Sequence, residues 1–165
     1  MLKPDLQVAD ITELTPELIR RLGADAVMVD LDDTIVPSGG DHMAPRVRDW
    51  SAALQAGGVK LMILSNGTRE RVEHWAAELG IPGLHMSGKP LRAAFRRGLA
   101  LLDSEPSSTV MAGDQLFTDV LGARLMGVRS VLVSPLSPGK LPHTRLLRRL
   151  ERLILRRNNG QPVDR

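Results

Sequence analysis

The sequence contains no cysteine and no tyrosine, and it has only two tryptophans and two phenylalanines among 165 residues. The absence of cysteine excludes a disulfide framework, a thiolate metal site and a cysteine nucleophile. The sequence also lacks any apolar run near the roughly 18 residues that cross a bilayer, and its N-terminus mixes acidic residues and a proline among the apolar ones. We therefore expect a soluble, cytoplasmic protein whose core is built from Leu, Val, Ile, Ala and Met.

The net charge of +3 is unevenly distributed along the chain. Residues 141–157 hold six arginines and one glutamate, a charge of +5, which leaves the rest of the chain at −2. Residues 134–142 (SPLSPGKLP) contain three prolines and a glycine, which is typical of a linker. The length fits one compact unit. We expect a single domain over residues 1–140, a basic amphipathic C-terminal helix over 141–157 and a disordered tail over 158–165.

Short apolar runs alternate with amphipathic stretches of helix length. Five runs have the length of buried strands, namely 26–29, 59–64, 83–86, 108–112 and 129–133. Helices are expected over 16–22, 44–56, 68–79, 90–102 and 117–126, several of them ending at a glycine. This alternation predicts an α/β protein: a Rossmann-like three-layer sandwich with a central parallel sheet and right-handed crossovers.

Polar residues follow four of the five predicted strands. The carboxyl ends of parallel strands meet at one edge of an open sheet, and ligands bind beyond that edge. The first strand runs directly into Asp30, Asp32 and Asp33. The next three strands are followed by Ser65-Asn66, by Ser87-Gly88-Lys89 and by Gly113-Asp114. The sequence therefore predicts one polar site assembled from segments that are far apart in the chain.

Carboxylates gathered at one edge need a counter-charge. Two like charges about 4 Å apart repel by roughly 4 kcal/mol at an effective dielectric near ~20, so Asp30, Asp32 and Asp114 require a cation. Carboxylate oxygens without His or Cys favour Mg²⁺ over zinc or copper. A carboxylate beside Mg²⁺ can attack a phosphorus neutralised by the metal and a lysine, and a second carboxylate two residues on can protonate the leaving group and then activate water. The pattern favours hydrolysis through an aspartyl-phosphate intermediate.

With these residues in place, the chain resembles the haloacid dehalogenase (HAD) superfamily over residues 26–133. Its four signatures occur here in order as DLDDT from Asp30, Ser65-Asn66, Lys89-Pro90, and Gly113-Asp114 with Asp119 following. Within the superfamily the chain is most similar to the capless subfamily IIIA phosphatases of the YqeG type, and it is similar to mitochondrial phosphatidylglycerophosphate phosphatases. The stretches DLDDTIVP, SNGTRERV and GDQLFTDV carry this closer likeness.

The resemblance implies roles for four aspartates. Asp30 would be the nucleophile and a metal ligand. Asp32 would be the general acid and base and would also offer the metal its backbone carbonyl oxygen. Asp114 would complete the Mg²⁺ site, and Asp119 would bind the metal through water or orient the lysine. An acid at Asp32 favours a phosphatase, because the ATP-driven pumps of the superfamily lack one there and keep their phosphoenzyme longer.

The resemblance also implies a phosphate-binding set. Ser65, together with the backbone of Asn66, would hold phosphoryl oxygens, and Lys89 would neutralise the nucleophile and the phosphate. The sequence departs from the expected YqeG pattern at Gly67, where a second Asn is expected. Each residue also has a simpler interpretation, since Ser and Asn cap helices and Lys89 precedes an expected helix start. Asp33 is assigned to turn chemistry.

The spacing of the motifs leaves no room for a large cap domain. Only 30 residues separate Thr34 from Ser65, and only 22 separate Asn66 from Lys89. An uncovered site suits a large or surface-presented phosphate, and a lipid head-group phosphate such as phosphatidylglycerophosphate is our substrate hypothesis. A soluble sugar phosphate, a nucleotide or a phosphoprotein remains open. The alternative function is a non-catalytic scaffold with this fold, acting at membranes or on ribosomal RNA.

The basic segment 141–157 allows three interpretations. On a helical wheel its leucines and its arginines occupy opposite faces. In the first interpretation, the leucine face packs on the domain and leaves the arginines in solvent. Anionic lipid at the inner face of the membrane is the second interpretation, because five net charges at roughly 1 kcal/mol each suffice for reversible recruitment. Nucleic acid is disfavoured, because no aromatic residues interleave with the arginines.

Overall fold

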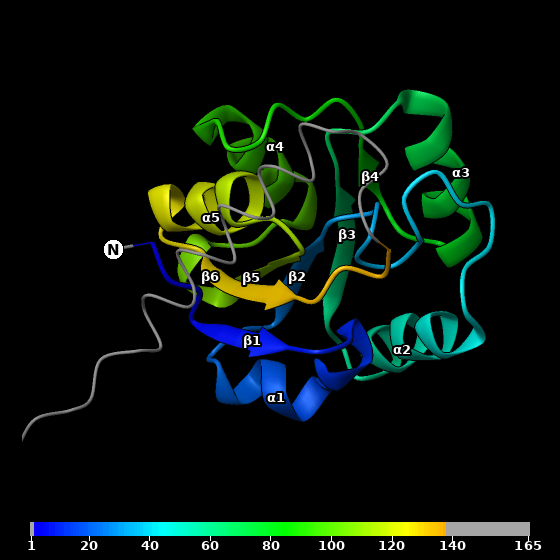
Figure 1. Cartoon of the computed structure of the whole chain (residues 1–165). Coiled ribbons are helices and arrows are strands. Elements are labelled where there is room, and N and C mark those ends of the chain that lie inside the picture. Colours follow the sequence, from blue (N-terminus) through cyan, green and yellow to red (C-terminus); the bar gives the residue numbers. More distant parts are fainter. Residues whose placement is uncertain (1, 138–165) are drawn as a thin grey trace, which may run out of the picture.

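The structure is a computed structural model that describes residues 2–137 (Figure 1). The predicted helix over 141–157 and the predicted tail over 158–165 lie outside these residues, as do the last three residues of the predicted domain 1–140. The described chain forms a six-stranded parallel sheet in the order β1-β6-β5-β2-β3-β4, with helices on both faces. The predicted three-layer α/β architecture is confirmed.

The strands are short and separated by helices. They are β1 (Leu6–Val8), β2 (Ala26–Val29), β3 (Lys60–Leu64), β4 (Gly83–Leu84), β5 (Thr109–Gly113) and β6 (Arg129–Val133). The α-helices are α1 (Pro16–Arg21), α2 (Pro45–Ala56), α3 (Arg69–Leu79), α4 (Arg92–Leu102) and α5 (Leu121–Met126). Short 3₁₀ turns cover Ile11–Glu13 and Pro106–Ser108, and a π-helical turn covers Leu116–Val120. Only α2 lies between β2 and β3, as the absence of a large cap predicts.

The central strand divides its side chains between two cores, because successive residues of a strand point to opposite faces. Val27 and Val29 pack in one core with residues of α1, α2 and α3, including Trp50. Met28 packs on the other face with residues of α4 and α5, and Phe95 is the largest side chain there. Both cores are mainly aliphatic, as the composition predicts. They clamp β2 from both sides and so fix where its last residue ends.

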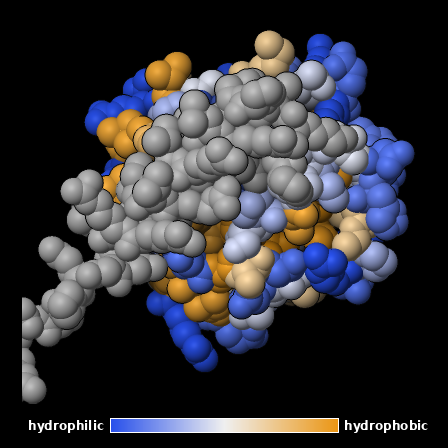
Figure 2. All heavy atoms as spheres, in the orientation of Figure 1, coloured by the Kyte–Doolittle hydropathy of each residue, from blue (hydrophilic) through white to orange (hydrophobic). Residues whose placement is uncertain are grey.

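The two edge strands differ from the sequence-based prediction. β1 was not predicted, because its three residues are too few for a recognisable period and they are only partly buried at the sheet edge. Figure 2 shows apolar residues reaching the surface near β1 and β6. At the other edge, β4 covers two residues instead of the predicted 83–86, and Met86 with a φ of 41° turns the chain away from the sheet.

Two helices also differ from their predicted ranges by more than one residue. α4 begins at Arg92 rather than at residue 90, because the chain first makes a turn in which the Leu91 N–H donates to Gly88 O at 2.9 Å. The predicted helix over 117–126 is a π-helical turn followed by the short α5. Within residues 2–137, none of the helices is both long and apolar enough to span a membrane.

Asp33 ties the loop after β2 to the end of the described chain. Its carboxylate accepts hydrogen bonds from the Ser38 N–H at 2.9 Å, from the Ser137 N–H at 3.2 Å and from the Ser137 hydroxyl. The Leu136 N–H donates to the Asp33 carbonyl oxygen at 3.0 Å. Asp33 has a φ of 63°, so the predicted turn role is confirmed. The segment after β6 therefore runs beside the loop that carries Asp30 and Asp32.

Candidate active site

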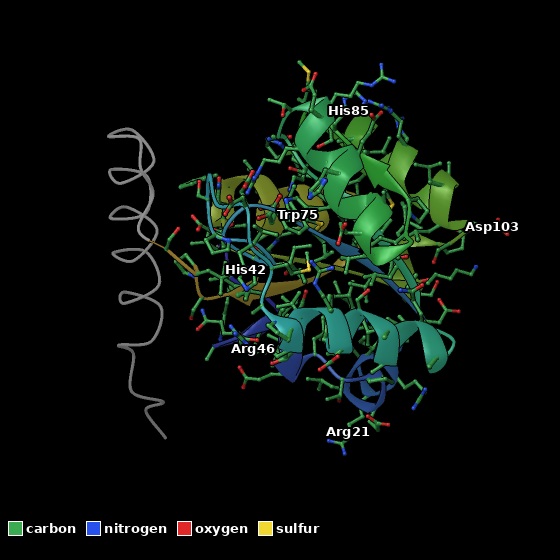
Figure 3. All side chains as sticks on the ribbon, turned by 90° about the vertical axis from the view of Figure 1, so that its right-hand side faces the viewer. Arg21, His42, Arg46, Trp75, His85 and Asp103 are labelled. Atoms are coloured by element: carbon green, nitrogen blue, oxygen red, sulfur yellow. The ribbon has the colours of Figure 1, made fainter. Side chains whose placement is uncertain are left out.

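Three adjacent strands bring most of the predicted site residues to the carboxyl edge of the sheet. β2 lies between β5 and β3, and the Asp30 N–H continues the pairing by donating to Ala112 O at 2.9 Å. Ser65 follows β3 and Asp114 follows β5 directly. The arrow of β6 points to the right in Figure 1, and that side of the molecule faces the viewer in Figure 3. His42 and His85 lie well apart in that view, which agrees with the absence of a histidine ligand pattern in the sequence.

Lys89 is the centre of the site. Its ammonium group donates to Asp30 Oδ1 at 2.9 Å and to Asp119 Oδ1 at 2.7 Å. The Lys89 side chain is 2% exposed, and the two carboxylates are also buried. A lysine is rarely buried unless it is paired, so the two carboxylates explain its position.

Burial and charge act in opposite directions on this group. Burial lowers the pKa of Lys89, but the charges of Asp119 and Asp30 raise it more, so the net pKa lies above its ordinary value. Burial raises the pKa of Asp119, against the lowering effect of Lys89. Lys89 is therefore a permanent positive charge at neutral pH and not a proton donor.

Three buried carboxylates form a group that fits a divalent cation. Asp30, Asp114 and Asp119 each offer an oxygen, and the three oxygens lie within 4.8 Å of one another. Lys89 supplies one positive charge against three negative charges, so two negative charges remain. An all-carboxylate set with this excess charge fits a hard dication such as Mg²⁺. The Asp32 carboxylate is not part of this group, which corrects the charge argument that placed it with Asp30 and Asp114. The family resemblance implied only its backbone carbonyl as a metal ligand.

The Asp32 carboxylate instead binds Arg71. Arg71 Nε donates to Asp32 Oδ1 at 2.7 Å. Burial raises the pKa of Asp32, although the hydrogen bond and the charge of Arg71 act to lower it. A carboxyl group with a raised pKa suits a proton donor. The sequence analysis assigned no role to Arg71, which lies within the stretch SNGTRERV. Its place on the first turns of the helix that follows Ser65 could have indicated it.

Asn66 holds the turn that carries Lys89. Its Oδ1 accepts from the Ser87 hydroxyl at 3.0 Å, the Gly88 N–H at 3.1 Å and the Lys89 N–H at 2.9 Å. Its Nδ2 donates to Lys89 O at 3.0 Å. The Asn66 side chain is therefore engaged in positioning Lys89, so a phosphate contact remains a prediction for its backbone.

Ser65 and Asp32 lie close together beside Gly67. The buried Ser65 Oγ accepts from the Gly67 N–H at 2.9 Å, and its own proton can still be donated. A Cβ built on Gly67 would lie 3.1 Å from Ser65 Oγ and 3.4 Å from Asp32 Oδ2. Glycine therefore lets the Ser65 hydroxyl and Asp32 Oδ2 approach the same point of the backbone, which a larger residue would crowd.

A glycine and a π-helical turn place Asp119. A Cβ on Gly113 would lie 2.1 Å from Asp119 Oδ2, so any larger residue would displace this carboxylate. Asp119 Oδ2 also accepts from the Gln115 N–H at 3.1 Å. π-Helical turns are rare in proteins overall, but those that occur are often at functional sites. This one directs Asp119 toward Lys89.

Comparison with known proteins agrees with this geometry. Residues 8–127 match the haloacid dehalogenase-like hydrolase family. The chain is 34% identical to a Bacillus subtilis protein named probable phosphatase YqeG, over 92% of this chain and 88% of that protein. It is 29% identical to the chloroplastic/mitochondrial phosphatidylglycerophosphate phosphatase 1 of Arabidopsis thaliana, of which it spans 50%.

The fold itself recurs in solved structures. The crystal structure of 3-deoxy-D-manno-octulosonate 8-phosphate phosphatase from Yersinia pestis superposes with a TM-score of 0.54 at 19% identity, covering 86% of this chain and 88% of that one. The fold and the carboxylate-lysine site define an α/β enzyme of the HAD-like type. The chain belongs to the haloacid dehalogenase-like hydrolases, as its resemblance to that superfamily led us to expect.

Proposed function

We propose that the protein is a Mg²⁺-dependent phosphomonoester hydrolase that acts through a phosphorylated Asp30. The contact of buried Lys89 with both Asp30 and Asp119 carries the proposal, because it sets a permanent cation beside the candidate nucleophile. The similarity to a protein named probable phosphatase supports the reaction type. The intact acids Asp30 and Asp32 argue against a purely scaffolding role.

Asp30, Asp114 and Asp119 would hold the metal, together with the backbone carbonyl of Asp32 that the family resemblance implies. When bound, Mg²⁺ would supply the positive charge that lowers the repulsion between the nucleophile and the phosphoryl oxygens. Lys89 would share this task through its contact with Asp30 Oδ1. Ser65 would donate to a phosphoryl oxygen over Gly67.

The chain's own residues would then move one proton in each half of the reaction. A carboxylate oxygen of Asp30 bonds to phosphorus while the bond from phosphorus to the leaving oxygen breaks. Asp32 gives its proton to that leaving oxygen. A water molecule then attacks the phosphorus, Asp32 takes the proton from the water, and inorganic phosphate leaves as the Asp30 carboxylate is restored.

The first test is hydrolysis of p-nitrophenyl phosphate in the presence of Mg²⁺. We expect activity in the wild type, and a loss of at least about 10³-fold in Asp30→Asn, which keeps the size of the side chain and removes the nucleophile. Asp41→Asn, a change of an exposed acid in the following loop, serves as the control. Activity that persists unchanged in Asp30→Asn would contradict the mechanism, and a wild type inactive on all phosphates tried would favour the scaffold.

For the substrate we propose a lipid head-group phosphate, such as that of phosphatidylglycerophosphate, and peripheral contact with the inner face of the membrane. Met86 and Leu91, which flank the Lys89 turn, are 71% and 66% exposed. The segment from 84 to 102 contains no acidic residue and includes three exposed arginines. An apolar and basic rim beside the site would suit an anionic lipid surface. The similarity to the plant phosphatidylglycerophosphate phosphatase adds support.

The rim gives a prediction for vesicle-bound substrate. In the double variant Met86→Ser, Leu91→Ser we expect the apparent KM on vesicles containing phosphatidylglycerophosphate to rise at least about tenfold, because burying one such side chain contributes about 1.5–3 kcal/mol. The kcat/KM on p-nitrophenyl phosphate should not change. Leu101→Ser removes an exposed leucine at the far end of α4 and is the matched control. An equal loss on both substrates would reject the lipid-facing role.

A further inference from the structure

Arg71 connects α3 to the loop after β2 through all three nitrogens of its guanidinium. Nε donates to Asp32 Oδ1 at 2.7 Å, one terminal nitrogen donates to Gly40 O at 2.7 Å and the other to Pro37 O at 3.1 Å. The side chain is only 23% exposed. A planar guanidinium with several fixed partners has one orientation, which a lysine could not reproduce. Arg71 therefore fixes the position of the Asp32 carboxylate relative to the sheet.

The two oxygens of Asp32 face different surroundings. Oδ1 accepts the hydrogen bond from Arg71. Oδ2 is on the side of Gly67, where a built Cβ would lie 3.4 Å from it and 3.1 Å from Ser65 Oγ. Rotation of the carboxylate would break the bond to Arg71, so the guanidinium keeps Oδ2 on the side of Ser65 Oγ, the hydroxyl that we propose as a phosphoryl ligand.

We propose that Arg71 is a positioning residue for proton transfer: by holding Oδ1, it aims Oδ2 of Asp32 at the oxygen that leaves the phosphorus. This inference rests on the proposed function. It adds Arg71 to the site, a residue to which the family resemblance assigned no role. In the step concerned, the bond from phosphorus to the leaving oxygen breaks, and the proton on Oδ2 moves to that oxygen. Arg71 itself exchanges no proton and contacts no substrate.

The effect of misaligning Asp32 depends on how basic the leaving group is. An alkyl phosphate releases a strongly basic alkoxide, which needs a proton as the bond breaks. p-Nitrophenolate is a weakly basic anion and leaves without one. A misaligned Asp32 should therefore slow the first substrate much more than the second. Damage to Asp30, Lys89 or the fold would slow both alike.

The experiment compares kcat/KM for glycerol 3-phosphate and p-nitrophenyl phosphate in the full chain with Mg²⁺. This parameter covers the steps up to release of the leaving group, so hydrolysis of the phosphoenzyme does not enter. We expect Arg71→Met to lower kcat/KM for glycerol 3-phosphate at least about tenfold more than for p-nitrophenyl phosphate, within the about 10²–10⁴-fold range of general acid catalysis. Asp32→Asn should show the same selectivity, and Arg71→Lys an intermediate one.

Arg69→Met is the matched control. Arg69 lies on the same helix, but it pairs with Glu73 at the surface, so both substrates should be unaffected. An equal loss on both substrates in Arg71→Met, or no loss, would overturn the positioning role while leaving the proposed function intact. A wild type that hydrolyses neither substrate would overturn both. If Arg71→Met does not fold, Arg71→Lys decides, and an unchanged ratio between the two substrates in that variant would reject the inference.

Discussion

Lys89 shows how much of the site depends on a single residue. It lies between Asp30 and Asp119, and no other cation within residues 2–137 is paired with either carboxylate. Removing one partner of a buried ion pair is costly, because the remaining charge stays buried without compensation. The same residue would therefore control both the stability of the edge and the reactivity of Asp30, the nucleophile in the proposed function.

In Lys89→Met we expect the free energy of unfolding in EDTA to fall by about 3–5 kcal/mol, because two buried carboxylates lose their counter-charge. Added Mg²⁺ should raise the melting temperature of the variant more than that of the wild type, since it restores part of the missing charge. Urea unfolding and thermal scans measure both effects. Lys60→Met, which removes an exposed lysine bound to Asp103 O, is the control. An unchanged stability would contradict the electrostatic account.

The sequence was sufficient to predict the residues that follow strands. Asp30, Ser65 and Asp114 come directly after apolar runs, so the parallel sheet alone implies that they approach one another. Arg71 could not be predicted in this way, because its role depends on which face of α3 turns toward Asp32. The use of the Asn66 side chain was also not predictable, because its partners lie on a turn 21 to 23 residues further along the chain.

At the scale of elements, the contact between α5 and the Lys89 turn is tight. A Cβ on Gly122 would lie 2.2 Å from the ring of Phe95 on α4 and 3.2 Å from the Cα of Pro90. Because Pro90 directly follows Lys89, a side chain at position 122 would push on the turn that carries the ammonium group. The packing of two helices is thus linked to the geometry of the site.

We expect Gly122→Ala to destabilise the protein by about 1–3 kcal/mol through overpacking and to lower kcat on p-nitrophenyl phosphate. Phe95→Leu alone should also destabilise, by leaving a cavity. In the double variant Gly122→Ala, Phe95→Leu the new methyl group gains room, so the combined loss should be smaller than the sum of the two single losses. A double-mutant cycle from urea unfolding measures this coupling. Strictly additive losses would show that the two residues do not press on each other.

Most elements were predicted within a residue or two, but β1, β4 and the π-helical turn before α5 were not. α2, α3 and β3 have enough residues for their period to stand out. β1 has three residues and gains its strand conformation from pairing with β6, whose partner residues are 125 positions away. The sequence of the π-helical turn before α5 predicts an ordinary helix. The extra residue of the turn accompanies the close fit of Asp119 against Gly113, which local helix propensity does not reveal.

At the scale of the whole molecule, residues 2–137 contain both hydrophobic cores and all the candidate site residues. The basic segment 141–157 is therefore not expected to be needed for the chemistry. Its six arginines and one glutamate would instead attract an anionic surface at roughly 1 kcal/mol per net charge.

We expect a variant without residues 141–165 to keep its melting temperature and its kcat/KM on p-nitrophenyl phosphate, and to sediment less with anionic liposomes than the full chain. Liposomes of neutral lipid, and the full chain at high salt, serve as controls, since charge attraction is screened by salt. Equal sedimentation of the two proteins would reject recruitment by this segment. A truncated protein that loses stability would indicate instead that the leucine face packs on the domain.

The bond from Ser137 to Asp33 also determines where foreign groups can be attached. Ser137 lies beside the loop that carries Asp30 and Asp32, whereas β1, parallel to its neighbour β6, starts at the amino-terminal edge of the sheet. A fluorophore or affinity tag inserted after residue 137 would therefore lie near the candidate site. The same label joined ahead of β1 would lie at the other end of the strands.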